Sequence, residues 1–270
     1  MADRAVLVTG ASRGIGRAIA RAFAGQGDRV AVHHRDSAGL AAGVLAGLPG
    51  RGHTVVQADL TDPDAARRMV DRACDALDGL DVLVNNAGVF TPHPITEVSY
   101  ARWQAAWQET LGVNLIGAAN VTWCAVQHMI GRGSGTGAGT GAGAAAGPAA
   151  GGTAGRIINV SSRGAFRGEP GQPAYGASKA GLNAFGQSLA RALAPHGIAV
   201  ATVAPGFVDT DMASEHLRGP AGDEIRAQSP FRRVAEAEEI AAAVLYLASP
   251  QAEWASGAIL DLNGASYLRS

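Results

Sequence analysis

The fold of this chain is decided by one stretch near its start, Thr9-Gly10-Ala11-Ser12-Arg13-Gly14-Ile15-Gly16. It follows a short apolar run, Ala5–Val8, and leads into Gly16–Gly25, whose apolar residues have helical spacing. Glycines between a strand and a helix permit a tight turn and let the backbone approach a phosphate closely. Unpaired N–H groups at the helix N-terminus can then bind the anion. The stretch predicts a dinucleotide-binding unit, although taken alone a plain glycine-rich turn fits it equally well.

Apolar runs and helical patterns alternate along the rest of the chain, which predicts a parallel sheet covered on both faces. The expected strands are Ala5–Val8, Val30–His33, Thr54–Gln57, Asp81–Val84, Arg156–Val160, Ala199–Ala204 and Ala258–Leu262. The expected helices are Gly16–Gly25, a stretch ending near Ala46, Pro63–Leu77, Trp103–Met129, Ala174–Ala194 and Glu236–Ala248. We therefore expect one α/β domain over residues 1–270, a Rossmann-like doubly wound parallel sheet of about seven strands.

One segment fits neither kind of element. Gly131–Gly155 consists almost entirely of Gly, Ala, Ser and Thr, with Pro148 inside it. Such a composition buries too little apolar surface to offset the entropy lost on ordering. We expect a tolerated low-complexity surface insertion, with a lid or a partner-binding arm as the alternative reading.

The composition is that of a compact soluble protein, with 47% hydrophobic and 17% charged residues. A net charge of −1 provides no basic surface for nucleic acid. No run of about eighteen strongly apolar residues occurs, and Met1–Arg4 is too short for a signal peptide, so we expect no membrane span and a cytoplasmic location. Cys74 and Cys124 form no CxxC pair, and the seven histidines show no metal-ligand spacing, so we expect neither a disulfide nor a metal site.

Tyr175 and Lys179 are the most informative pair in the second half of the chain. Spaced four apart on an expected helix, they share one face, and Ser162 lies thirteen residues before the tyrosine. A free phenol has a pKa of about 10, and a nearby ammonium together with a cationic nicotinamide favours the phenolate. Lowering that pKa by about 3 units would take about 4 kcal/mol. The pair alone would be an ordinary surface feature. With the glycine turn, it indicates hydride transfer with a tyrosine acid and a serine that binds the substrate oxygen.

The choice of cofactor depends on the end of the second strand. An NAD enzyme usually carries a carboxylate there for the ribose 2′-hydroxyl. Here Arg35 follows the strand, with Asp36 one residue later. Arg35, aided by Arg13, could pair with a 2′-phosphate, which favours NADP(H) over NAD(H). The alternative is that both arginines are merely solvated and that Asp36 rotates in.

Other polar residues follow the expected strands. Asp59 is placed to accept a hydrogen bond from the adenine amino group, because Asp62 is better suited to cap the next helix. Asn85-Asn86-Ala87-Gly88 is suited to support a ribose, or is simply a turn. His33-His34 is expected to be structural, and Trp103 and Trp107 to belong to a core or an interface.

These motifs resemble those of the short-chain dehydrogenase/reductase family over nearly the whole chain apart from Gly131–Gly155. The resemblance rests on Thr9–Gly16, Asn85–Gly88, Asn114, Ser162, Tyr175 with Lys179, and Pro205-Gly206. It implies that Tyr175 is the acid/base, that Ser162 rather than Ser161 orients the carbonyl, and that Lys179 lowers the tyrosine pKa. It also implies that Asn114 holds a water of the proton relay. The cofactor-binding set that it implies is Gly10, Ser12, Arg13, Gly14, Ile15, Gly16, Arg35, Asp59, Leu60, Asn86, Ala87, Gly88, Tyr175, Lys179, Pro205, Gly206, Val208 and Thr210.

Within the family the chain is most similar to 3-oxoacyl carrier-protein reductases. Gly10–Gly16, Asp209-Thr210-Asp211-Met212 and Ile259–Tyr267 carry this similarity. The resemblance implies NADPH-dependent reduction of a 3-oxoacyl thioester or a related ketone by a homodimer or homotetramer. Alternatives are an NAD(P)-dependent sugar, steroid or polyketide alcohol dehydrogenase, a dinucleotide-binding regulator, and a scaffold that uses the Gly/Ala tract.

A carrier-protein partner is less well indicated than the chemistry. Reductases that dock an acidic carrier tend to have basic residues at the end of the long helix and on the tyrosine helix. Here the expected long helix runs into the Gly/Ala tract after Arg132, and the tyrosine helix ends Ala194-Pro195-His196. Phe207–Pro230, which contains Met212, His216 and Leu217, is expected to close over a partly apolar substrate.

Overall fold

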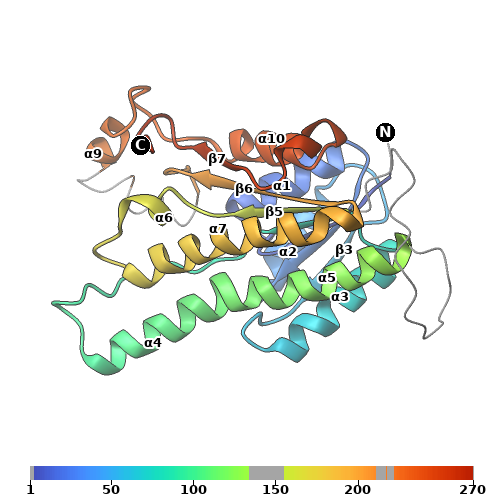
Figure 1. Cartoon of the computed structure of the whole chain (residues 1–270), viewed down its shortest axis with the longest axis horizontal. Coiled ribbons are helices and arrows are strands. Elements are labelled where there is room, and N and C mark those ends of the chain that lie inside the picture. The colour runs from blue at the N-terminus through green and yellow to red at the C-terminus, as the bar shows by residue number, and fades with distance from the viewer. Residues whose placement is uncertain (1–2, 134–154, 211–216, 218–221, 270) are drawn as a thin grey trace.

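The computed structural model describes residues 3–133, 155–210, 217 and 222–269, and these form a single α/β domain (Figure 1). Seven parallel strands make one sheet in the order β3-β2-β1-β4-β5-β6-β7. The strands are β1 (Ala5–Val8), β2 (Arg29–His34), β3 (Thr54–Gln57), β4 (Val82–Asn85), β5 (Gly155–Val160), β6 (Ile198–Pro205) and β7 (Ile259–Leu262). The predicted doubly wound sheet is confirmed.

The strand order reverses between β1 and β4. The chain first builds outward from β1 to β3, then crosses back and builds from β4 to β7. Val6 pairs with Val82 and Val8 with Val84, so the two strands end side by side. In open α/β sheets a ligand binds outside the carboxyl ends of the strands at such a reversal. The topology therefore points to the loops that follow β1 and β4.

Helices cover both faces of the sheet (Figure 1). Side chains alternate along β1, so Val6 and Val8 join one core cluster while Ala5 and Leu7 join the other. The first face carries α1 (Gly14–Gly25), α2 (Ala38–Ala46) and α10 (Ala237–Leu247). The second face carries α3 (Pro63–Leu77), α5 (Ala118–Gly133) and α7 (Pro173–Leu193), with α4 (Tyr100–Leu111) against α7.

The predicted continuous helix Trp103–Met129 is interrupted. Between α4 and α5 lies a π-helical turn, η1 (Gly112–Gly117), which carries Asn114. A Cβ on Gly117 would lie 2.9 Å from both the Cβ and the carbonyl oxygen of Leu60. The small residue thus lets the helix pass close to the loop after β3. Single π-turns inside α-helices occur frequently at functional sites.

Other boundaries differ from the sequence expectations for local reasons. Helix α5 extends to Gly133 and β5 begins at Gly155, so both ends of the predicted insertion belong to regular elements, while residues 134–154 lie outside the described part of the chain. Short helices α6 (Gly164–Arg167) and α9 (Gly222–Ala227) were not predicted, because so few residues show no periodicity. Asp62 caps α3 by accepting hydrogen bonds from two backbone N–H groups, as expected.

The helices in the described residues are all too short or too polar to span a membrane. Both cysteines are buried, Cys74 in α3 and Cys124 in α5, where they pack as small apolar residues in the second core cluster.

Candidate active site

Side-chain and backbone hydrogen bonds join the turn after β1 to the turn after β4. The Thr9 hydroxyl accepts from the backbone N–H groups of Asn86, at 2.9 Å, and Ala87, at 3.0 Å. The Asn86 amide donates to the carbonyl oxygens of Thr9, at 2.9 Å, and Gly10, at 3.1 Å. The amide of Asn86 is therefore used inside the protein. Its contribution to a ligand site is to hold the two turns as one unit.

The glycines of the first turn leave no room for a side chain. Gly10 has φ +64°, and a Cβ there would lie 2.8 Å from the Ala87 Cα. At Gly16 a Cβ would lie 2.5 Å from the Asn86 Nδ2. Gly14, the first residue of α1, has φ +52°. A bare backbone at a helix N-terminus is suited to the pyrophosphate of a dinucleotide, so this turn stays the predicted phosphate-binding site.

His33 is a site residue that the sequence reasoning treated only as structural. Its Nδ1 accepts from the Gly10 N–H at 3.0 Å, and its Nε2 lies 3.1 Å from the Ala58 carbonyl oxygen. Because Nδ1 accepts, Nε2 carries the proton and donates to Ala58. Burial is the main cause that lowers the pKa of His33 to about 4. A neutral imidazole thus ties the glycine turn to the ends of β2 and β3.

The predicted ribose-phosphate end of the site is exposed. Arg35 pairs with Asp36, and this hydrogen bond raises the pKa of the arginine. Ser37 donates to the Ser12 hydroxyl at 2.8 Å, while Arg13 lies exposed just before α1. Arg35, predicted to bind a 2′-phosphate, and Asp36, the alternative ligand for the ribose, therefore form an ion pair with each other.

The other predicted adenine-side residues differ from one another in exposure. Asp59 is exposed and accepts from the Thr61 backbone at 2.9 Å, a bond that lowers the pKa of the carboxyl. Leu60 is buried against the π-helical turn, so its side chain packs in the core rather than facing a ligand.

The four predicted catalytic residues come from three elements that converge beside these turns. The Ser162 hydroxyl, after β5, is hydrogen-bonded to the Tyr175 phenol on α7. Lys179, one turn further along α7, donates to the Val160 carbonyl at 2.8 Å. A Cβ on Gly88 would lie 3.4 Å from the Asn114 Oδ1 and 3.5 Å from the Lys179 Nζ. A Cβ at these distances would make ordinary van der Waals contact, so Gly88 lies directly beside both groups.

The structure distinguishes the two adjacent serines. Ser161 is buried, and its hydroxyl donates to the Lys179 backbone carbonyl at 3.2 Å. Ser162 is partly exposed and accepts from the Gly164 N–H at 3.0 Å. The hydrogen bond to the phenol is made by Ser162, the serine that the resemblance selects, and its role in orienting a carbonyl stays a prediction.

Asn114 is held by a residue that the sequence reasoning missed. Its Oδ1 accepts from the Val89 N–H at 2.8 Å, and its Nδ2 donates to the Ser178 hydroxyl at 3.1 Å. Ser178 in turn donates to the Tyr175 carbonyl at 2.8 Å. The π-helical turn and the tyrosine helix are thus locked together. A serine one residue before Lys179 is the only signal in the sequence.

The pKa of Tyr175 shifts in the direction opposite to the one expected from Lys179. Burial raises the pKa of the phenol and outweighs the hydrogen bond from Ser162, which lowers it. Burial also lowers the pKa of Lys179 to about 8. The ammonium lies 5.8 Å from the centre of the tyrosine ring. The surroundings therefore disfavour both charged forms, an effect that helical spacing alone does not reveal.

The predicted carboxamide-binding turn follows β6. The Gly206 N–H donates to the Leu262 carbonyl at 3.0 Å, and Val208 forms a parallel bridge with Ala235. Thr210 lies against the glycine turn, since a Cβ on Gly14 would be 3.3 Å from its Cγ2. Of the expected substrate-covering segment, Met212 and His216 lie outside the described residues.

Comparison with known proteins identifies the family. Residues 4–151 match the model described as short chain dehydrogenase, and residues 136–264 match the model described as enoyl-(acyl carrier protein) reductase. The chain belongs to the short-chain dehydrogenase family. Its resemblance to that family, inferred from six motifs, is confirmed.

Named members of the short-chain dehydrogenase family match along their whole length. The chain is 33% identical over 267 residues to the 3-oxoacyl-[acyl-carrier-protein] reductase FabG of Staphylococcus aureus, covering 98% of each chain. It is 34% identical over 266 residues to the FabG of Aquifex aeolicus, covering 97% of this chain and 96% of that one.

Solved structures of the family agree in fold. A short-chain dehydrogenase from Burkholderia cenocepacia in complex with NADP has a TM-score of 0.82 at 34% identity, with 98% of each chain covered. A dehydrogenase/reductase from Sinorhizobium meliloti also has a TM-score of 0.82, at 32% identity, with 99% of this chain and 96% of that chain covered.

The neutral bridge at His33 predicts an acid-dependent loss of stability. The folded pKa of about 4 lies below the ordinary value of 6.5, so the unfolded chain binds more protons between these values. The contribution is complete above pH 6.5 and falls by about 3 kcal/mol as the pH decreases toward 4. Urea unfolding at pH 7, 5.5 and 4.5 measures it. His33→Asn should flatten this dependence and His196→Asn, at a partly exposed histidine after α7, should not; an equal slope in both variants contradicts the assignment.

Proposed function

We propose that the protein is an NADPH-dependent carbonyl reductase acting on a 3-oxoacyl thioester or a related ketone. One observation carries the proposal: Ser162, Tyr175, Lys179 and Asn114 converge beside a glycine turn that fits a pyrophosphate. The FabG relatives, whose names specify 3-oxoacyl substrates, support the substrate class. We further propose that the enzyme is located in the cytoplasm.

The bound nicotinamide supplies the hydride in this proposal, and the protein supplies the proton. Tyr175 donates its phenolic proton to the substrate oxygen while Ser162 donates a hydrogen bond to the same oxygen. Because burial raises the phenol pKa, Tyr175 is protonated at neutral pH, which is the form that a reductase requires at the start of a cycle.

Lys179 and Asn114 act on the phenolate that remains. With a pKa of about 8, Lys179 is mostly charged at neutral pH and stabilises the negative oxygen. Asn114 Oδ1 accepts one backbone hydrogen bond and has a second lone pair for a relay water. Its side chain, fixed by Ser178, gives that water a defined position.

NADP(H) is favoured over NAD(H) because two guanidiniums, Arg13 and Arg35, flank the end of β2 and the glycine turn. A planar guanidinium binds a phosphate through two hydrogen bonds. The NADP complex of the Burkholderia relative supports the same choice. A 2′-phosphate would compete with Asp36 for Arg35.

Rival functions and partners remain separable by experiment. An NAD-linked sugar or steroid dehydrogenase would prefer NADH, and a dinucleotide-binding regulator would bind cofactor without needing the Tyr175 phenol.

A homodimer or homotetramer is supported by Ile116 and Trp123, which are 56% and 63% exposed on the η1 and α5 segment. An acyl carrier protein is retained as a partner only through the relatives' names.

Replacing Tyr175 by Phe removes the proton donor and keeps the ring, which packs edge-on to Phe90 at 5.0 Å between ring centres. We expect kcat for ketone reduction to fall by about 10²- to 10⁴-fold, with the Kd for NADPH unchanged. Stopped-flow turnover and fluorescence titration measure the two quantities. Retention of turnover would exclude Tyr175 as the acid.

Arg35→Ala should weaken NADPH binding about tenfold or more and leave NADH binding nearly unchanged, since only NADPH carries the 2′-phosphate. Asp36→Ala is the matched variant. It releases Arg35 from its ion pair and should tighten NADPH binding. Titration with both cofactors measures the preference, and equal losses for NADPH and NADH in Arg35→Ala would overturn the phosphate assignment.

A further inference from the structure

A charged side chain that the proposed chemistry does not use follows the candidate serine directly. Arg163 is only 5% exposed, and burial lowers the pKa of its guanidinium. Among the ion pairs of the described residues, none joins Arg163 to a carboxylate. Glu169 is near enough to act on Arg163 electrostatically but is not paired with it, and a buried charge without a direct ionic partner destabilises a fold. Its position beside Ser162 therefore indicates a role other than stability.

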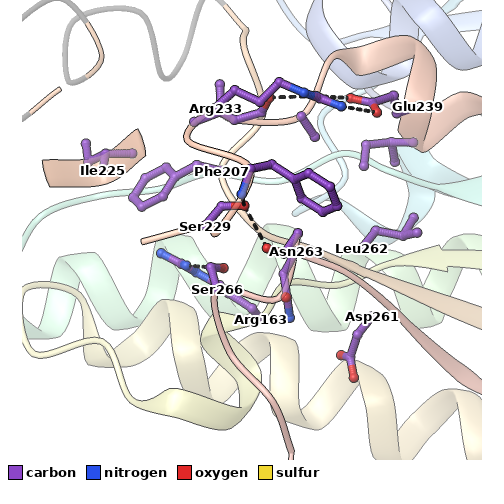
Figure 2. Close-up of a pocket in the computed structure, with 15 residues that line it drawn as sticks. Arg163, Phe207, Ile225, Ser229, Arg233, Glu239, Asp261, Leu262, Asn263 and Ser266 are labelled. Atoms are coloured by element: carbon purple, nitrogen blue, oxygen red, sulfur yellow. Dashed lines mark hydrogen bonds and ion pairs between the residues drawn. The ribbon is translucent and has the colours of Figure 1, made fainter. Parts of the chain in front are cut away.

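The guanidinium reaches two segments that are remote in sequence. Its Nη1 donates to the Ser266 hydroxyl at 2.6 Å, in the tail that follows β7. Its Nη2 donates to the Gln228 Oε1 at 2.6 Å, just after α9. Figure 2 shows Arg163 directed at Ser266 along the wall of a cavity of about 300 Å³.

Arg163 also holds the turn after β6. Its backbone N–H donates to the Pro205 carbonyl at 2.8 Å, and its Cζ lies 4.8 Å from the centre of the Phe207 ring. An arginine over an aromatic face is attracted by the ring quadrupole. Phe207 precedes Val208, which belongs to the predicted carboxamide-binding turn. One residue thus links the substrate side of the site, at Ser162, to the cofactor side.

A second guanidinium provides an internal comparison. Arg167 in α6 also donates to the Gln228 Oε1, at 3.2 Å, but it is exposed and lacks the contacts with Ser266 and Phe207. The α9 end and the tail are further joined to each other by Ser229, whose hydroxyl donates to the Gly264 carbonyl at 2.7 Å. These bonds join the end of α9 to the tail, and Arg163, which follows Ser162 directly, connects both segments to the candidate serine.

We propose that Arg163 is a positioning residue that holds the turn after β6, the end of α9 and the tail in one geometry relative to Ser162. The effect of Arg163 on the reaction rate rests on the proposed function. Hydride transfer is sensitive to small misplacements of donor and acceptor, so loss of this link lowers the rate of the chemical step more than it lowers binding.

Arg163→Met keeps the length of the side chain and removes its charge. We expect kcat to fall about ten- to a hundredfold, while KM for the ketone and the Kd for NADPH stay within about twofold. The thermal midpoint should stay the same or rise, because a buried charge is gone. A merely structural residue would instead lower the midpoint together with kcat.

Arg163→Lys retains charge without the planar fork and should regain part of kcat, and Arg167→Met should keep the wild-type kcat.

Hydrogen exchange followed by mass spectrometry tests the link without turnover. Peptides covering residues 222–229 and 263–269 should exchange faster in Arg163→Met and at the wild-type rate in Arg167→Met. Wild-type kcat in Arg163→Met, equal losses in both variants, or unchanged exchange would overturn the proposal. If the wild-type protein reduces no ketone, the proposed function fails, and the exchange rates still decide the role of Arg163.

Discussion

The site depends on the hydrogen bonds that join the turn after β1 to the turn after β4. Four bonds made by Thr9 and Asn86 cross this boundary, two of them to each other and one each to Ala87 and Gly10, and His33 adds a tie from β2. Adjacent parallel strands place their carboxyl ends together, and these bonds help to fix the position of the glycine turn above the sheet. The helix N-terminus and the catalytic groups of α7 are thereby set against one shared edge, where a cofactor and a substrate can meet.

Buried polar groups around that edge are satisfied in unusual ways. His33 is neutral and bridges two backbone groups, Lys179 is held by one carbonyl oxygen, and Arg163 has only neutral hydrogen-bond acceptors and an aromatic ring. Burial opposes the charged form of all three side chains, as their lowered pKa values indicate. Such shifts concentrate where chemistry requires particular protonation states. The edge of this sheet shows that pattern.

The succession of strands along the chain and the motifs of the candidate site could be predicted from the sequence because both are local. A glycine turn between a strand and a helix, and a tyrosine four residues before a lysine, need no knowledge of distant contacts. The π-helical turn at Asn114 was missed because it depends on the approach of Gly117 to Leu60. The upward shift of the tyrosine pKa could not be read from the sequence, because burial is set by the whole fold.

The most direct test follows the hydride itself. The protein would be incubated with a 3-oxoacyl thioester and NADPH carrying two deuterium atoms at nicotinamide C4, and the product examined by mass spectrometry and NMR. We predict one deuterium on the carbon that bears the new hydroxyl group. Tight cofactor binding without any reduced product, or a product whose new hydrogen comes from solvent, would contradict this prediction.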